Sequence, residues 1–557
     1  MYLKEKKIPR RLAGLVLFLA AAAAIWKLAA DSGNAGWMSE KAKEREKVPV
    51  FIESCLIDSE ADEVVVKASA EHVPDSDDEY FYLFVLNPYE DEIAEGNGYV
   101  LRKRKEKEVE FHSETEWNSD TELFYKYVIA VKRENRYVAV SIPHYITNPE
   151  AGAVFVSNGE RPSGKKGLLI DPDKLLSPEL EELGVKHAAY NIPISRILGH
   201  DSEDIYEAVH YSYNGKDYVF NGRVMAEYDL IFRTLSDRGI EITAIILNDY
   251  SEDYPWLIHP LARSGIGKPP YYAFNASDRE GAEYLAAIGT FLTRRYSGRM
   301  NGRGVVANWV IGNEIDARKE WNYMEHVDLE TYVREYVRAY RIFYNSIKSV
   351  NSACRVYISL DNQWNRVNVL TQSYRAKDVL DEFNRQIKEE GNIDWGLAIH
   401  PYNKPLSRTD TWNHSFYVKE TEYTPVVTMA NIHVVTDYMR QEEFLNGEGN
   451  VRSITLSELG YTSSKGEELQ AAAIVYAYKI AEMNPYIDAI LFSRQTDAED
   501  EIRKLKLYLG LDEVDGTHKY AYDVYKYMDT DEAEKYTGFV EEYTGYSKTW
   551  NFMKRQN

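Results

Sequence analysis

Cysteine is almost absent from this chain of 557 residues, since only Cys55 and Cys354 occur. Neither belongs to a CxxC motif or to a Cys/His cluster with metal-ligand spacing, so the sequence indicates neither a disulfide framework nor a zinc site. Basic residues are also few: 66 Lys and Arg stand against 89 Asp and Glu, for a formal net charge of −23. Binding to a nucleic-acid backbone needs a basic patch, so we expect no nucleic-acid partner.

The hydrophobic run near the N-terminus is short. It extends from Leu12 to Trp26, follows the basic residues Lys4 to Arg11, and contains 15 residues. A comfortable transmembrane helix needs roughly 20 residues, whereas a basic flank before a shorter apolar run is typical of an export signal. We therefore expect an exported protein, extracellular or at the cell surface. Residues 1–30 would be a cleaved signal peptide or an N-terminal anchor that holds the membrane through residues 12–30, and residues 31–47 a linker.

Residues 48–150 contain seven short apolar runs separated by polar clusters. Such spacing predicts a small antiparallel β-sandwich. No part of it suggests catalysis, and binding of glycan and a purely structural role both remain open for it.

From about residue 160 to 530, β-branched strands alternate with segments of helical spacing. The strands are expected at 167–171, 186–194, 240–247, 305–312, 355–360, 393–399, 453–456 and 487–492. Eight parallel strands with crossover helices close a (β/α)8 barrel, a TIM barrel, whose catalytic face is formed by the loops after the strands. Residues 531–557 would be a C-terminal extension that packs on the barrel.

Two glutamates end strands of this predicted barrel. Glu314 follows the apolar strand Asn308-Trp309-Val310-Ile311 and the pair Gly312-Asn313, and Glu458 lies in Ser453-Ile454-Thr455-Leu456-Ser457-Glu458. Either glutamate alone could be a surface residue, but two of them at the ends of strands 4 and 7 of an eight-strand count predict a pair of catalytic carboxylates over the barrel mouth.

These motifs resemble the clan of retaining glycoside hydrolases known as the 4/7 superfamily, or clan A. The resemblance implies that Glu314 is the acid/base, that Glu458 is the nucleophile, and that Asn313 binds the sugar 2-hydroxyl. His400-Pro401-Tyr402 after strand 6 is similar to the clan's His-x-Tyr, which implies that Tyr402 donates to the nucleophile. The chain also resembles an uncharacterised exported family that is assigned to this clan by fold, and that resemblance implies no particular sugar.

Further polar and aromatic residues lie where substrate would be recognised, at strand ends or on the loops that follow. The candidates for substrate binding are Asn313, Tyr402, His400, Arg196, Asn248, Asn362, Trp364, Trp321 and Arg494. Strand 8 ends in Phe492-Ser493-Arg494 where many clan members have tryptophan. Arg494 could indicate an anionic group on the substrate, or it could pair with Glu458 or a neighbouring acid.

The sequence therefore predicts an exported glycoside hydrolase that cleaves an oligo- or polysaccharide with retention of configuration and without a metal or organic cofactor. The alternative is a non-catalytic glycan-binding protein of the cell surface. A metal-dependent barrel hydrolase would need His and Asp ligands at several strand ends, and only His400 lies at one. The sequence carries no indication of an oligomeric state.

Overall fold

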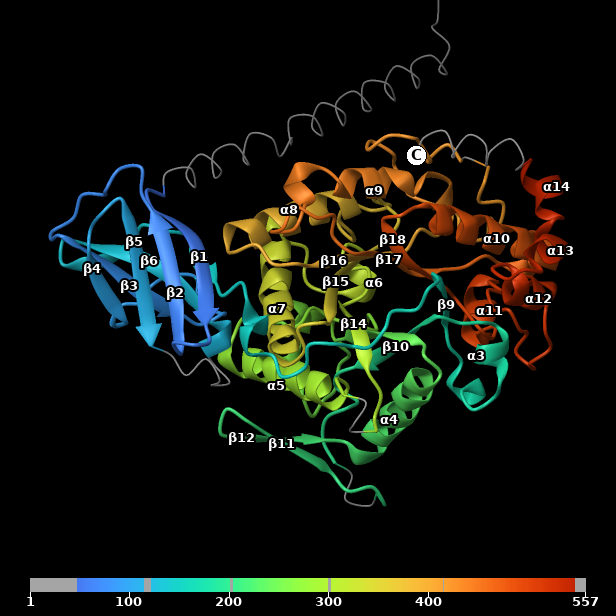
Figure 1. The fold of residues 1–557 in the computed structure, drawn as a ribbon, viewed down its shortest axis with the longest axis horizontal. Coiled ribbons are helices and arrows are strands. Elements are labelled where there is room, and N and C mark those ends of the chain that lie inside the picture. The colour runs from blue at the N-terminus through green and yellow to red at the C-terminus, as the bar shows by residue number, and fades with distance from the viewer. Residues whose placement is uncertain (1–47, 115–121, 201–203, 299–301, 414, 546–557) are drawn as a thin grey trace, which may run out of the picture.

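The computed structural model describes residues 48–114, 122–200, 204–298, 302–413 and 415–545. The expected signal or anchor at 1–30, the linker at 31–47 and the end of the C-terminal extension at 546–557 lie outside the described residues. Within those five ranges, the helices are too short or too polar to cross a membrane. Figure 1 shows a β-rich part beside a larger part in which helices surround strands.

The N-terminal part consists of two antiparallel sheets, as the short apolar runs predict. One sheet has the order β1-β2-β5 and the other the order β4-β3-β6-β7, with β8 paired to β6. Alternate residues of β2, Val64, Val66 and Ala68, are buried and belong to one core cluster with Phe81 and Phe111, as expected for strands with a period of two residues. The strands are β1 (Phe51–Asp58), β2 (Glu63–Ser69), β3 (Tyr80–Leu86), β4 (Leu101–Arg104), β5 (Glu108–Glu114), β6 (Lys126–Arg133), β7 (Arg136–Ala139) and β8 (His144–Tyr145).

The larger part is a closed barrel of eight parallel strands, and the predicted (β/α)8 fold is confirmed. Its neighbours follow the order of the chain, and β18 pairs with β9 to close the ring. The strands are β9 (Lys166–Leu169), β10 (His187–Pro193), β13 (Glu241–Leu247), β14 (Val306–Ile311), β15 (Arg355–Leu360), β16 (Gly396–Ile399), β17 (Ile454–Leu459) and β18 (Ile487–Phe492).

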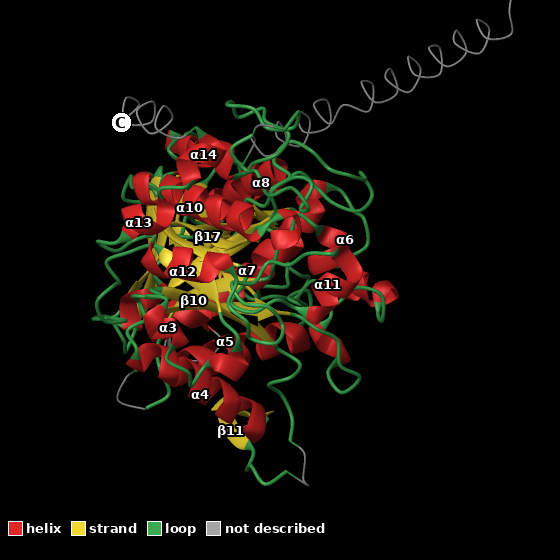
Figure 2. Ribbon diagram, turned by 90° about the vertical axis from the view of Figure 1, so that its right-hand side faces the viewer, coloured by secondary structure: helices red, strands yellow, loops and turns green. Residues whose placement is uncertain are grey.

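Helices form the outer layer around these strands, as Figure 2 shows. Side-chain caps explain where two of the long helices begin: Asp278 accepts from Gly281 N at the start of α5, and Asp328 accepts from Thr331 N at the start of α7. The helices are α3 (Glu179–Glu182), α4 (Gly222–Asp237), α5 (Arg279–Arg295), α6 (Arg318–Trp321), α7 (Leu329–Val350), α8 (Ala376–Glu389), α9 (His433–Met439), α10 (Glu467–Met483), α11 (Glu499–Leu505), α12 (Tyr520–Tyr527), α13 (Ala533–Thr537) and α14 (Val540–Thr544).

Apolar side chains pack inside the barrel, and ion pairs lie at its amino end. Ala189, Val310 and Leu491 belong to an apolar cluster formed by barrel strands. At the start of β15, Arg355 pairs with Glu241 at 3.0 Å and with Asp488 at 3.2 Å. These ion pairs lie at the end where the strands begin, whereas the sites of such barrels form at the carboxyl ends of the strands.

One element differs from the sequence reading. The insertion after β10, at residues 195–221, contains a hairpin of β11 (Val209–Tyr213) and β12 (Lys216–Phe220), two strands that are not among the expected ones. Asn214 and Gly215 form its turn with φ of +48° and +70°, the conformation that Asn-Gly favours in two-residue hairpin turns. In Figure 1 the hairpin projects from the lower edge of the barrel.

Candidate active site

The turn that carries Glu314 is fixed by Ser359 of the neighbouring strand. After β14, Gly312 has φ +77° and Glu314 itself has φ +39°, a left-handed conformation that is uncommon for a residue other than glycine. The Ser359 hydroxyl accepts from Glu314 N at 3.0 Å, and the Ser359 carbonyl accepts from Ile315 N at 3.0 Å. Because Ser359 is fully buried, it holds the Glu314 backbone in this unusual geometry.

His400, directly after β16, links the strands of the two glutamates. Its Nδ1 lies 2.7 Å from Glu314 Oε1, and its Nε2 lies 3.0 Å from the hydroxyl of Ser457. Ser457 immediately precedes Glu458 on β17. Burial alone lowers the pKa of His400, but the hydrogen bond to Glu314 and the charges of Glu314 and Glu458 raise it overall.

Tyr402 of the same loop binds the second glutamate. Its hydroxyl donates to Glu458 Oε1 at 2.8 Å, the contact that the resemblance implied. The loop is itself held by Asn362, whose side-chain amide donates to the Tyr402 carbonyl at 2.6 Å. Two residues of one loop, His400 and Tyr402, therefore fix both carboxylates.

Glu314 lies in surroundings that favour its protonated form. Burial, the negative charge of Asp361 and that of Glu458 raise the pKa of Glu314 from 4.5 to about 7, although His400 opposes the shift. Asp361 is tied to Asp316, whose Oδ1 accepts from Asp361 N at 2.9 Å. Burial and the charge of Asp361 also raise the pKa of Asp316 well above its usual range. The site thus concentrates carboxyl groups and keeps part of them protonated.

The other predicted residues lie in different environments. Asn313 is buried directly before Glu314, and Asn248 is buried with its amide donating to the carbonyls of Leu257 and Ala273. None of the described residues hydrogen-bonds to the Asn248 side-chain oxygen. Arg196 is 72% exposed, with Nε 3.8 Å from Asp249 Oδ2.

Trp321, Trp364 and Arg494 also differ in their burial and in their partners. Trp321 on α6 is partly exposed and stacks on Tyr271, with ring centroids 5.8 Å apart. Trp364 is fully buried and donates Nε1 to the Glu422 carbonyl, so its ring supports a loop. Arg494 pairs with Glu501 of α11. The sequence allowed two kinds of partner for Arg494, a neighbouring acid of this kind or an anionic group of the substrate.

Three residues that fix the centre were not among the sequence candidates: Ser359, Ser457 and Asp316. Ser359 and Ser457 lie at the ends of buried strands, which is the signal that could have found them. No group of three or more His, Cys, Asp or Glu side chains that could hold a metal ion is found in the described part of the chain.

No curated protein matches this sequence. Similar solved structures include a family 39 glycoside hydrolase from the gut symbiont Bacteroides cellulosilyticus WH2, with 14% identity, TM-score 0.45, and coverage of 83% of this chain and 78% of that one. A hyperthermophilic β-glucosidase from Pyrococcus furiosus is 12% identical with TM-score 0.44, over 67% of this chain and 88% of that one. A family 1 β-glucosidase from Thermotoga maritima is 14% identical with TM-score 0.35, over 67% and 87% of the two chains.

The model of the family of unknown function DUF5722 matches residues 158–552. This range includes the described barrel from β9 to β18 and the loops that carry Glu314, His400, Tyr402 and Glu458. The chain belongs to the DUF5722 family.

Proposed function

We propose that this protein is an exported glycoside hydrolase that cleaves an oligo- or polysaccharide by a retaining double displacement. The observation that carries the proposal is that one loop binds both strand-end glutamates, His400 to Glu314 and Tyr402 to Glu458. A pair of carboxyl groups in unlike environments is what acid-assisted glycoside cleavage requires. Export rests on the basic and apolar pattern of residues 4–26.

In the first step Glu458 is the nucleophile. Tyr402 holds Oε1 of its carboxylate, which leaves Oε2 to attack the anomeric carbon. The bond from that carbon to the glycosidic oxygen breaks, and the Glu314 proton passes to the departing oxygen. With a pKa of about 7, Glu314 is largely protonated at mildly acidic pH and about half protonated at neutral pH, so it can act as the general acid.

In the second step Glu314 is the base. Ester formation neutralises Glu458, whose charge contributes to the raised pKa of Glu314. The pKa of Glu314 therefore falls in the glycosyl-enzyme, and its carboxylate can take a proton from water. The water oxygen then bonds to the anomeric carbon, and the ester bond to Glu458 breaks. Two displacements on one carbon retain its configuration.

Substrate contacts follow from the position of the remaining residues. Asn313 directly before Glu314 is assigned to the sugar 2-hydroxyl, and Trp321 with Tyr271 provides a stacked aromatic surface for a sugar ring. Arg494 is assigned to a neutral sugar hydroxyl, because Glu501 already balances its charge.

Turnover of a broad panel of aryl glycosides by the protein from Asp31 onward tests this function, with Glu314→Gln and Glu458→Gln measured beside it. We expect hydrolysis of at least one glycoside by the parent protein and its loss in both variants. If the parent cleaves none of them, yet binds glycans on an array as both variants do, the protein is a glycan-binding protein and the proposal is wrong.

A further inference from the structure

A pocket of 640 Å³ lies between the β-sandwich and the barrel, away from the two catalytic glutamates. One wall comes from the sandwich and includes Lys126, Tyr137 and Ala139, and the other comes from α7 and the end of α8, with Arg334 and Glu390. Pockets for small molecules usually measure about 300–1,000 Å³ and often form at domain boundaries. This pocket has the size and the position of a ligand site.

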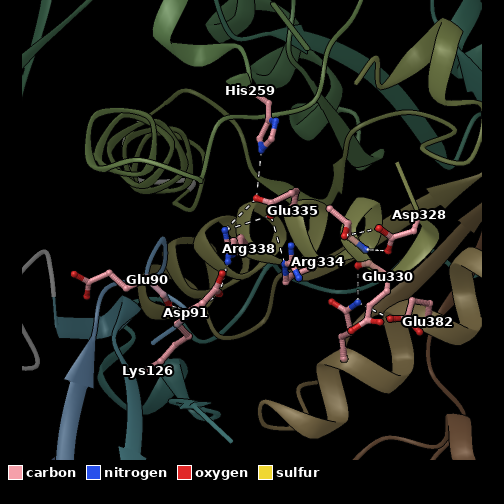
Figure 3. Close-up of polar contacts among 12 residues, drawn as sticks. Glu90, Asp91, Lys126, His259, Asp328, Glu330, Arg334, Glu335, Arg338 and Glu382 are labelled. Carbon is pink, nitrogen blue, oxygen red and sulfur yellow. Dashed lines mark hydrogen bonds and ion pairs between the residues drawn. The ribbon is translucent and has the colours of Figure 1, made fainter. Parts of the chain in front are cut away.

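Charged contacts hold the two walls together. Arg338 on α7 binds Asp91 of the sandwich and lies 3.1 Å from Glu335 Oε2 of its own helix. Lys126 is buried, lies 3.9 Å from Asp91, and donates to the Glu90 carbonyl. Figure 3 shows these side chains meeting between the sandwich strands and α7. Because Arg338 and Lys126 are tied to fixed partners, the pocket is formed before any ligand arrives.

Two polar groups in the barrel wall have bonding capacity left. The Glu390 carboxyl is mostly buried, and no described donor hydrogen-bonds to it. Burial raises the pKa of Glu390 even though Lys126, Arg341 and Arg338 lie near enough to oppose the shift. The Arg334 Nε is buried and lies 3.5 Å from Glu335 Oε1, but the Arg334 side chain as a whole is 35% exposed, and within the described residues its terminal amino groups have no hydrogen-bond acceptor. An acceptor and a donor therefore both border the pocket without a hydrogen bond.

The charges around the pocket select an uncharged ligand. Its lining holds the acids Asp91, Glu92, Glu389 and Glu390, which outnumber the cations Lys126 and Arg334 and disfavour an anion. The cations beside Glu390 disfavour a second cation at that position. A hydroxyl group, by contrast, can donate to a carboxylate and accept from a guanidinium at once. Val128, Val138, Ile142 and Pro143 supply apolar surface in the same lining, which suits the C–H face of a sugar ring.

We propose that this pocket is a second, non-catalytic binding site for a neutral saccharide, held by Glu390 and Arg334 from the barrel and by Tyr137 from the sandwich. The site would bind sugar independently of Glu314 and Glu458. The sandwich would then help to bind carbohydrate beside the barrel.

Isothermal titration calorimetry with cellobiose, lactose, maltose and diacetylchitobiose tests the proposal on the full chain carrying Glu458→Gln, which prevents turnover. Ala139→Trp fills the pocket from an exposed strand position, and Glu390→Gln removes the carboxylate. Ala61→Trp introduces the same alanine-to-tryptophan change at an exposed turn outside the pocket and is the matched control for Ala139→Trp. Hydrolysis of aryl glycosides by Ala139→Trp in the otherwise native chain is measured in parallel and should equal that of the parent.

We expect at least one disaccharide to bind. Ala139→Trp should weaken that binding by about tenfold or more because the indole occupies the pocket, and Glu390→Gln should weaken it by about tenfold because a charged hydrogen bond is lost. Ala61→Trp should leave it unchanged. Binding whose affinity and stoichiometry Ala139→Trp leaves unchanged, or no binding of any of the four sugars, overturns the proposal. Neither outcome touches the proposed hydrolase function, which is read from the aryl glycosides.

Discussion

Replacing His400 by phenylalanine should raise the pH at which Glu314 loses its proton. His400 Nδ1 lies 2.7 Å from Glu314 Oε1, and this contact lowers the pKa of Glu314. A hydrogen bond to a charged group contributes about 1.5–3 kcal/mol, and about 1.4 kcal/mol corresponds to one pH unit. The pKa of Glu314 should therefore move from about 7 to about 8–9 in His400→Phe.

The assay is the pH dependence of kcat/KM on a glycoside with a poor leaving group, because departure of such a group requires the Glu314 proton. The alkaline limb of the profile reports the acid in the free enzyme and should move up in His400→Phe. Asp361→Asn should have the opposite effect. The Asp361 charge raises the pKa of Glu314, so its removal should move the alkaline limb to lower pH. Titration of ¹³C-labelled glutamate carboxyls gives the same readout without substrate.

Tyr402→Phe is the matched control, because Tyr402 contacts Glu458 and not Glu314. Its alkaline limb should stay where the parent has it. If His400→Phe and Asp361→Asn shift the limb in the same direction, or if neither shifts it, the account of Glu314 as an acid tuned by these two neighbours is wrong.

Three other predictions follow from the same contacts. Tyr402→Phe removes the hydrogen bond to Glu458 and should lower kcat by about 10- to 100-fold, because about 1.4 kcal/mol is a factor of ten; an unchanged kcat in steady-state kinetics would contradict the role of Tyr402. Glu314→Gln should gain stability relative to the parent as pH rises from 4.5 to about 7, because the raised pKa of Glu314 makes its ionisation unfavourable to folding; urea unfolding should show a relative gain that builds up across that window to about 3 kcal/mol and then stays constant. Arg338→Ala removes one ion-pair partner of the buried Glu335 and the contact to Asp91, so thermal unfolding should show a free energy of unfolding lower by about 3–5 kcal/mol. Arg279→Ala removes an exposed ion pair and should cause no measurable loss of stability.

The sequence was sufficient to predict the barrel because its strands are buried on both sides. Such strands appear as continuous apolar runs, and the eight runs expected correspond to the eight strands of the ring. The position of Glu314 and Glu458 at strand ends followed from the same pattern. The hairpin at 209–220 is not among the expected strands although Asn214-Gly215 is a strong turn signal, because its two short strands mix polar and apolar residues and form no apolar run.

Contacts between strands could not be predicted from local pattern. Ser359 and Ser457 become neighbours of Glu314 and His400 only through the register of the closed barrel. The partner of Arg494 also depended on three-dimensional structure, since the acid that binds it, Glu501, lies on a short helix beyond a loop. The burial of Trp364 likewise depends on a loop 58 residues further along, whose Glu422 carbonyl accepts its Nε1–H.

The most direct test of the central claim is to trap the covalent intermediate. The protein is treated with the 2-deoxy-2-fluoro derivative of the best glycoside from the panel and then digested, and the modified peptide is sequenced by mass spectrometry. The account predicts one fluoroglycosyl group esterified to Glu458, and no such adduct in Glu458→Gln. An adduct on another residue, or turnover that inverts the anomeric configuration with no adduct formed, would contradict the assignment of Glu458 as the nucleophile of a retaining enzyme.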